Sequence, residues 1–212
     1  MKFRFFLICI ISVVICFGQT TQTKKQITDL KNGILFVRLS TREKTVEDLK
    51  KMGKTRAAEE IRNEQEIKNK KIVEAFKTNF KFCEYSFFYS QYSNEIQNRN
   101  FKFMIFDKDL KPDSDFNLNG RPFFVAEFGV LQADTARTFR DTKLQSTANF
   151  NVESTPIYSQ NSPNKIYALI IKDNNYVQLK YPFPYYVNAY NTDRAVRKMN
   201  QKLNSFYNKS FK

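Results

Sequence analysis

With 212 residues, the chain is long enough for one domain with a hydrophobic core. It contains no histidine, which excludes Ser-His-Asp and Cys-His nucleophile activation, histidine acid–base catalysis and most transition-metal sites. None of its five glycines falls at the spacing of a phosphate-binding loop, so we expect neither nucleotide chemistry nor a cofactor.

Residues 1–18 have the organisation of a secretory signal peptide. Lys2 and Arg4 precede an apolar run over residues 5–17, and small residues stand before a cut after Gly18. The run is shorter than the roughly 20 apolar residues of a membrane span. A retained anchor is the alternative, while a lipid-modified cysteine is disfavoured because isoleucines precede both cysteines of this segment. We expect export to the periplasm or cell envelope, or secretion, with no transmembrane span in the mature chain.

The predicted cut changes both the thiol content and the charge of the chain. Of three cysteines, only Cys83 would remain, which rules out an internal disulfide. We expect Cys83 to be a small buried apolar residue. The formal net charge of +14 falls to +12 when the two positive charges of residues 1–18 are removed.

A strand–helix–strand unit organises the predicted domain, which spans residues 33–212 and follows a flexible leader at residues 19–32. The apolar runs over residues 34–39 and 82–89 are typical of strands buried on both faces. The long charged helical stretch between them favours a parallel pair with a crossover helix. Ser40 to Glu43 predicts a capping box at the start of this helix, and Gly53 predicts a bend or a short break in it.

The remaining elements follow in chain order. Further strands are predicted at residues 101–106, 122–131 and 165–172, and a short return strand at residues 176–179. Ser93 is a predicted cap for a short helix over residues 94–99, and residues 132–163 read as a polar irregular connection. A closing helix is predicted from about residue 193 to residue 207. The fold class is therefore α/β or α+β, a single domain with a mixed sheet covered by the first and the closing helix.

Carboxylates offer the remaining route to catalysis. Glu84 and Glu127 interrupt apolar strands and are candidates for a glycan-hydrolysing pair. In the acidic loop that contains Asp107 and Asp109, the pattern Asp113-x-Asp115-x-Asn117 resembles the opening of a calcium loop, but the glycine and the bidentate glutamate of that motif are missing. We expect a polar connection there rather than a metal site, and we favour a protein that is not an enzyme.

The C-terminal positive charge is the better functional signal. Residues 180–212 contain seven Lys or Arg and a single acid, Asp193. Four cations fall on one side of the closing helix, opposite its apolar side: Arg194, Lys198, Lys202 and Lys209. We expect them to bind an anionic envelope polymer or lipid headgroups. Export argues against nucleic acid, and a solvated face that only aids solubility is the alternative.

The segments Ser40-Thr41-Arg42-Glu43, residues 79–83 and residues 87–90, together with the signal peptide, resemble exported Bacteroidota proteins of unknown function. The resemblance covers mainly residues 34–93. It implies an envelope location and carries over no site residue. Two other functions stay open: a carboxylate-dependent glycan hydrolase, and an envelope scaffold or assembly partner that uses the aromatic stretch from Tyr181 to Tyr186.

Overall fold

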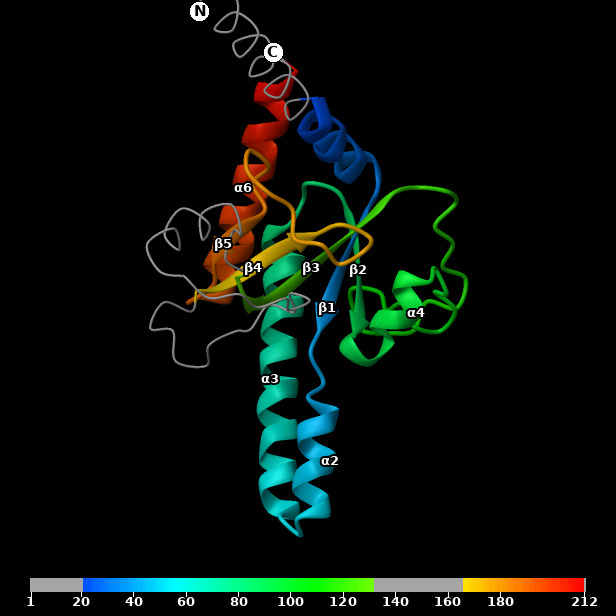
Figure 1. Cartoon of the computed structure of the whole chain (residues 1–212), viewed down its shortest axis with the longest axis vertical. Coiled ribbons are helices and arrows are strands. Elements are labelled where there is room, and N and C mark those ends of the chain that lie inside the picture. Colours follow the sequence, from blue (N-terminus) through cyan, green and yellow to red (C-terminus); the bar gives the residue numbers. More distant parts are fainter. Residues whose placement is uncertain (1–20, 132–165, 212) are drawn as a thin grey trace, which may run out of the picture.

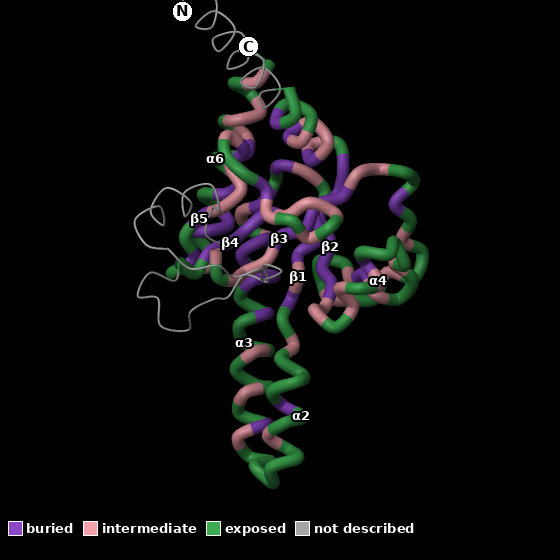
Figure 2. The backbone as a smooth tube through the Cα atoms, in the orientation of Figure 1, coloured by how far each residue is buried: buried purple, intermediate pink, exposed green. Residues whose placement is uncertain are grey.

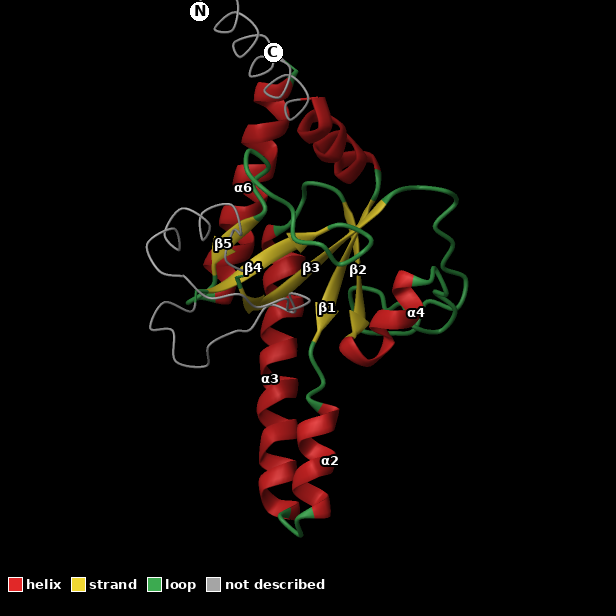
Figure 3. Ribbon diagram, in the orientation of Figure 1, coloured by secondary structure: helices red, strands yellow, loops and turns green. Residues whose placement is uncertain are grey.

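A mixed β-sheet lies at the centre of the fold (Figures 1 and 3). The computed structural model describes residues 21–131 and 166–211, so the predicted signal peptide and the polar connection over residues 132–163 lie outside the described residues. Within this part of the chain the sheet has five strands in the order β2-β1-β3-β4-β5. The strands are β1 (Ile34–Leu39), β2 (Glu84–Tyr89), β3 (Phe123–Val130), β4 (Tyr167–Lys172) and β5 (Tyr186–Asn188).

The predicted parallel unit is confirmed. β1 pairs in parallel with β2, from Ile34 opposite Glu84 to Leu39 opposite Tyr89, and in parallel with β3 on its other side. β3–β4 and β4–β5 are antiparallel, which makes the sheet mixed. Central β1 is hydrophobic at almost every position because both of its faces are covered.

The crossover consists of α2 (Glu43–Lys51) and α3 (Thr55–Asn79). The break at Gly53 is confirmed, because this glycine has φ of +72° in the turn between the two helices. The capping-box prediction is wrong: α2 starts after Arg42, which has φ of 53°, and no side chain caps it. Ser40 instead accepts a hydrogen bond at its carbonyl from Asn69 Nδ2 at 2.8 Å.

One face of the sheet packs against helices. The larger core cluster joins this face to α3 and to α6 (Thr192–Ser210), with Phe76 and Met199 fully enclosed. Residues 21–32 belong to the same layer and are helical, so the predicted flexible leader is wrong for this part. Thr23, Ile27 and Leu30 are buried at helical spacing, and this weak periodicity is the signal that sequence reasoning missed.

The opposite face is covered by residues 90–121, which include η1 (Ser90–Tyr92) and α4 (Ser93–Gln97). The strand predicted at residues 101–106 is wrong. Only Phe106 pairs with β2, through one bridge to Phe87, because neighbouring apolar side chains turn down onto Phe36 and the rest of this face. Ser93 begins α4 and does not cap it.

The closing helix is confirmed as α6, whose buried side includes Val196, Met199 and Leu203. The return strand predicted at residues 176–179 is reduced to one bridge between Lys172 and Gln178.

The α2–α3 hairpin extends beyond the sheet, and Figures 1 and 2 show it as a mostly exposed projection. In the described ranges, no helix combines the length and the apolar character that crossing a membrane requires.

Candidate functional site

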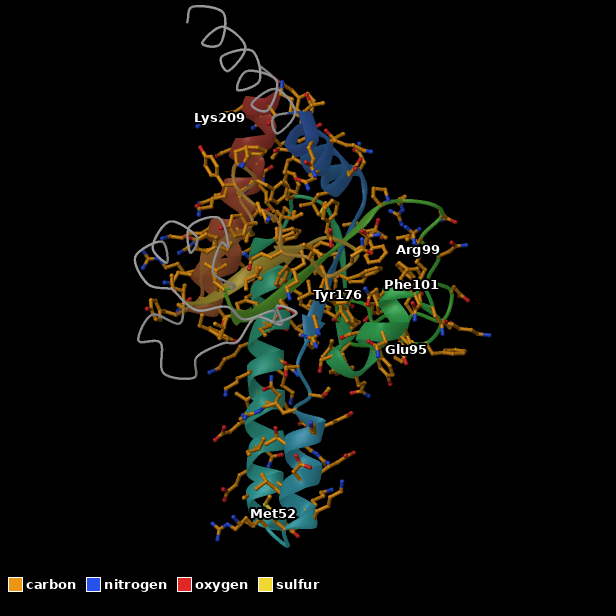
Figure 4. The ribbon with its side chains drawn as sticks, in the orientation of Figure 1. Met52, Glu95, Arg99, Phe101, Tyr176 and Lys209 are labelled. Atoms are coloured by element: carbon orange, nitrogen blue, oxygen red, sulfur yellow. The ribbon has the colours of Figure 1, made fainter. Side chains whose placement is uncertain are left out.

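The four predicted cations lie on the solvent side of α6. Arg194, Lys198, Lys202 and Lys209 are all exposed. Their spacing, one or two helical turns apart, keeps them on one side of the helix while Met199 and Leu203 face the core. Figure 4 shows Lys209 extending outward from the end of α6. We call this set the basic face.

Three of the four basic-face residues share a groove. Lys198, Lys202 and Lys209 line an open groove of about 440 Å³ together with Pro184, Gln201, Ser205 and Phe206. Arg194 does not line it. Lys202 already has two contacts within the protein. Its Nζ donates to the Tyr186 carbonyl at 3.3 Å and lies 5.7 Å from the centre of the Tyr186 ring.

The positive charges of the basic face are not balanced by acidic side chains of the described residues. Within residues 21–131 and 166–211, none of its four cations forms an ion pair with an acid. The single acid of α6, Asp193, instead accepts from Asn79 Nδ2 at 2.6 Å. The positive charges therefore remain available to an anion from solution.

Contacts at the start and middle of α6 hold the basic face in place. Asn191 caps the helix by accepting from the Arg194 backbone N–H at 2.8 Å. Asn200 accepts from the Lys81 backbone N–H, also at 2.8 Å. The first bond stabilises the start of α6 and the second ties the helix to the α3–β2 connection, so the cations are carried by a fixed element and not by a loop.

The candidate hydrolytic pair does not come together. Glu84 lies opposite Ile34 and Glu127 opposite Arg38, which separates them by about 13 Å along the strands at roughly 3.3 Å per residue. Glu84 pairs with Arg121 at 2.6 Å. Two carboxylates that act across a glycosidic bond need a separation of about 5 to 9.5 Å, so this pair lacks the required geometry.

The acidic loop satisfies its own backbone. Asp107 Oδ1 accepts from the backbone N–H groups of Asp109 and Lys111, and Asp113 Oδ1 accepts from that of Asp115. Asp109 also pairs with Lys77 at 2.9 Å, which lowers the pKa of Asp109 and raises that of Lys77. Across the described ranges, no three acids or cysteines are grouped to hold a metal ion.

An ion cluster that sequence reasoning did not assemble lies on the sheet face covered by residues 90–121. Glu127 receives Arg38 Nη1 at 3.1 Å and Lys172 Nζ at 2.6 Å. Arg38 Nε also donates to Ser93 Oγ at 3.0 Å. The available signal was the charged residue inside the apolar runs of β1 and β3 and at the end of that of β4.

Tyr176 packs beside this cluster and has φ of 62°, an uncommon conformation for an aromatic residue. Burial raises the pKa of Tyr176 to about 12, while Ser93 and Arg38 oppose that rise. The hydroxyl therefore stays protonated at neutral pH. Glu95 Oε2 is buried nearby on α4 without a hydrogen-bond partner among the described residues, and Figure 4 shows both residues on this side of the molecule.

The aromatic stretch does not form a continuous exposed patch. Tyr181 is 84% exposed, whereas Phe183 is 1% exposed and packs into the core. The feature that would have supported an assembly surface here is therefore missing.

Comparisons of the chain with protein-family models, with curated proteins and with solved structures found no match.

Proposed function

We propose that this chain is an exported, non-catalytic envelope protein that binds a polyanionic partner through the basic face of α6. The observation that carries the proposal is the groove of about 440 Å³ lined by Lys198, Lys202 and Lys209, whose cations have no acidic partner within the described residues. Attraction between such a groove and a dense anionic surface is long-ranged at low salt.

The chemistry of the groove favours phosphate- or carboxylate-bearing polymers and anionic headgroups. Lysine ammonium groups act as mobile point charges that tolerate many anion geometries, in contrast to the fixed fork of arginine. Phe206 and Pro184 supply apolar contact at the same groove. This combination suits an extended repeating anion better than one small ligand that must be held in one orientation.

The test is binding of residues 19–212 to phosphatidylglycerol vesicles and to dextran sulfate across a salt series. We expect binding that falls steeply between about 50 and 500 mM NaCl, because screening shortens the Debye length. The variant Lys198→Glu/Lys209→Glu should weaken binding by about tenfold or more, since it reverses two groove charges. It spares Lys202, which also contacts Tyr186.

The matched control is Lys50→Glu/Lys51→Glu, which changes the net charge equally at the end of α2, on the projecting hairpin. Binding of the control should stay within about twofold of the unmodified chain. Equal losses in both variants would show that net charge, and not the basic face, is responsible. Absence of binding at low salt would reduce the face to a role in solubility.

A further inference from the structure

A second basic region opens at another part of the molecule, at the carboxyl-end edge of β1 and β3. It is an open cleft of about 660 Å³ between this edge and α3, lined by residues that include Arg38, Arg42, Lys68, Lys71, Glu127 and Tyr167. The crossover from β1 runs through α3 on one face of the sheet, and the chain returns from β2 over the other face before β3. Ligands of α/β sheets bind at the carboxyl edge of such a reversal in connectivity.

The charges of this cleft are strongly unbalanced. Four of its lining residues are cations and one, Glu127, is an acid. Glu127 is already neutralised, because it lies between Arg38 Nη1 and Lys172 Nζ. Arg42, Lys68 and Lys71 form no ion pair within the described residues. The cleft therefore concentrates positive potential between protein walls.

Arg38 is a preorganised donor at this site. Its Nε donates to Ser93 Oγ at 3.0 Å and its Nη1 contacts Glu127, which fixes the plane of the guanidinium group. The side chain keeps 35% of its surface exposed. A fixed guanidinium with an accessible edge suits the oxygen geometry of a phosphoryl group.

The remaining walls favour a small organic ligand. Ile72, Phe128 and Tyr167 provide apolar surface, and Ser40, Gln65 and Thr192 provide polar groups. The cleft therefore combines polar and apolar walls, and its volume of about 660 Å³ lies in the usual range of small-molecule sites. A cleft of this volume fits a small anion better than it fits an extended polymer.

We propose that this cleft binds a small phosphorylated organic anion, with Arg38, Arg42, Lys68 and Lys71 contacting the phosphoryl oxygens. The inference is independent of the basic face of α6, since the two regions share no lining residue.

Calorimetric titration of the purified chain with pyrophosphate tests the proposal, with citrate as a carboxylate comparison of similar charge. We expect saturable one-site binding of pyrophosphate in the millimolar range or tighter, and weaker binding of citrate. Lys68→Gln/Lys71→Gln should weaken pyrophosphate binding by about tenfold or more. Both side chains are exposed, and an unchanged melting temperature without ligand confirms that the variant folds.

Two controls separate this site from diffuse charge and from the basic face. Lys50→Gln/Lys51→Gln removes the same charge from the hairpin, and Lys198→Glu/Lys209→Glu alters only the α6 groove; both should bind pyrophosphate as the unmodified chain does. No saturable binding at about 10 mM pyrophosphate, or equal losses in the hairpin control, would overturn the proposal. Preference for citrate would overturn the phosphoryl assignment.

Discussion

At the scale of single residues, Gly33 shows how closely two segments approach. It connects the helix over residues 21–32 to β1. A Cβ atom at this position would meet the Pro122 carbonyl and would lie 2.6 Å from the Asp29 carbonyl oxygen. Both neighbours are backbone, so neither can rotate away. Glycine is needed here for space and not for an unusual φ.

Gly33→Ala should therefore lower the free energy of unfolding by about 2 kcal/mol or more, in the range of an overpacked core. Urea denaturation followed by circular dichroism measures the change. Gly129→Ala is the matched control, because its added Cβ meets only the Glu127 side chain at 3.6 Å. Equal stability of the Gly33 and Gly129 variants would contradict the predicted clash.

The Arg38–Glu127–Lys172 cluster is a second residue-scale determinant. Glu127→Gln removes the carboxylate that both cations share, and the Lys172 side chain is only 13% exposed while that of Arg38 is 35% exposed. We expect a loss of about 2–4 kcal/mol, because two partly buried cations are left without a counter-charge. Denaturant unfolding measures this loss. The control is Glu84→Gln, which should cost less than about 1 kcal/mol because the Glu84 side chain is 54% exposed. Similar losses of stability in Glu127→Gln and Glu84→Gln would contradict the larger contribution that we assign to Glu127.

Cys83 gives the protein a pH-dependent stability. Burial raises the pKa of its thiol to about 12 from a reference of 9.0, so the folded state favours the protonated form. The stabilisation is present below about pH 9 and is lost as pH rises towards 12, because the unfolded chain ionises first.

We expect the melting temperature to fall over this alkaline range, and less steeply in Cys83→Ala. The pKa of the Tyr176 hydroxyl is also raised, so the melting temperature of Tyr176→Phe is a second comparison.

The reactivity of the Cys83 thiol is a separate test. At neutral pH this thiol should react with iodoacetamide far more slowly in the native protein than in urea. Cys83 is partly buried, and labelling as fast in the native protein as in urea would contradict the raised pKa of its thiol.

At the scale of elements, α3 has two different environments. Its C-terminal half buries Ile72, Val73 and Phe76 against the sheet, whereas its first half packs mainly against α2 through residues such as Ala58 and Val46. The first half lies in the projecting hairpin (Figure 2). A helix pair with so few buried apolar side chains gains little stability from packing.

Amide hydrogen exchange should resolve the two halves of α3. We expect residues 55–65 to exchange through local opening, faster than residues 72–76 of the same helix and than β1. Mass spectrometry of peptic peptides measures the difference, and the C-terminal half of α3 serves as the internal control. Uniform protection along α3 would show that the hairpin is stabilised by contacts other than those described.

At the scale of the whole molecule, cations gather in two separate regions of the part of the chain that the structure describes. One is the lysine groove of α6, which lies on a convex helix face. The other is the cleft at the carboxyl edge of the sheet, where apolar walls accompany the cations. The first is suited to an extended anion and the second to a small one, because enclosure determines how much of a ligand can be contacted.

The net charge of +14 also predicts how salt affects stability. Repulsion among unpaired cations destabilises the folded state at low ionic strength. Raising NaCl from about 20 to 200 mM should therefore raise the melting temperature, and the rise should be smaller in Lys68→Gln/Lys71→Gln. Differential scanning fluorimetry measures both effects, and a melting temperature that falls with salt would show that the ion pairs outweigh the repulsion.

Local patterns in the sequence were sufficient for the parallel strand–helix–strand unit, the break at Gly53 and the two-sided character of α6. Each depends on hydrophobic periodicity or on one residue's backbone preference, which act over a few neighbouring positions. The basic face follows from the same periodicity. Its groove does not, because Pro184 comes from outside the helix.

The conformation of residues 101–106, the ion cluster and the basic cleft depend on the tertiary structure. The segment over residues 101–106 has strand-like composition, yet packing against Phe36 outweighs that preference and leaves one bridge at Phe106. The ion cluster and the basic cleft combine β1, β3 and β4 with α3 and the residue that precedes α2. Strand register and helix placement bring these distant positions together, and neither is encoded in any single stretch of the chain.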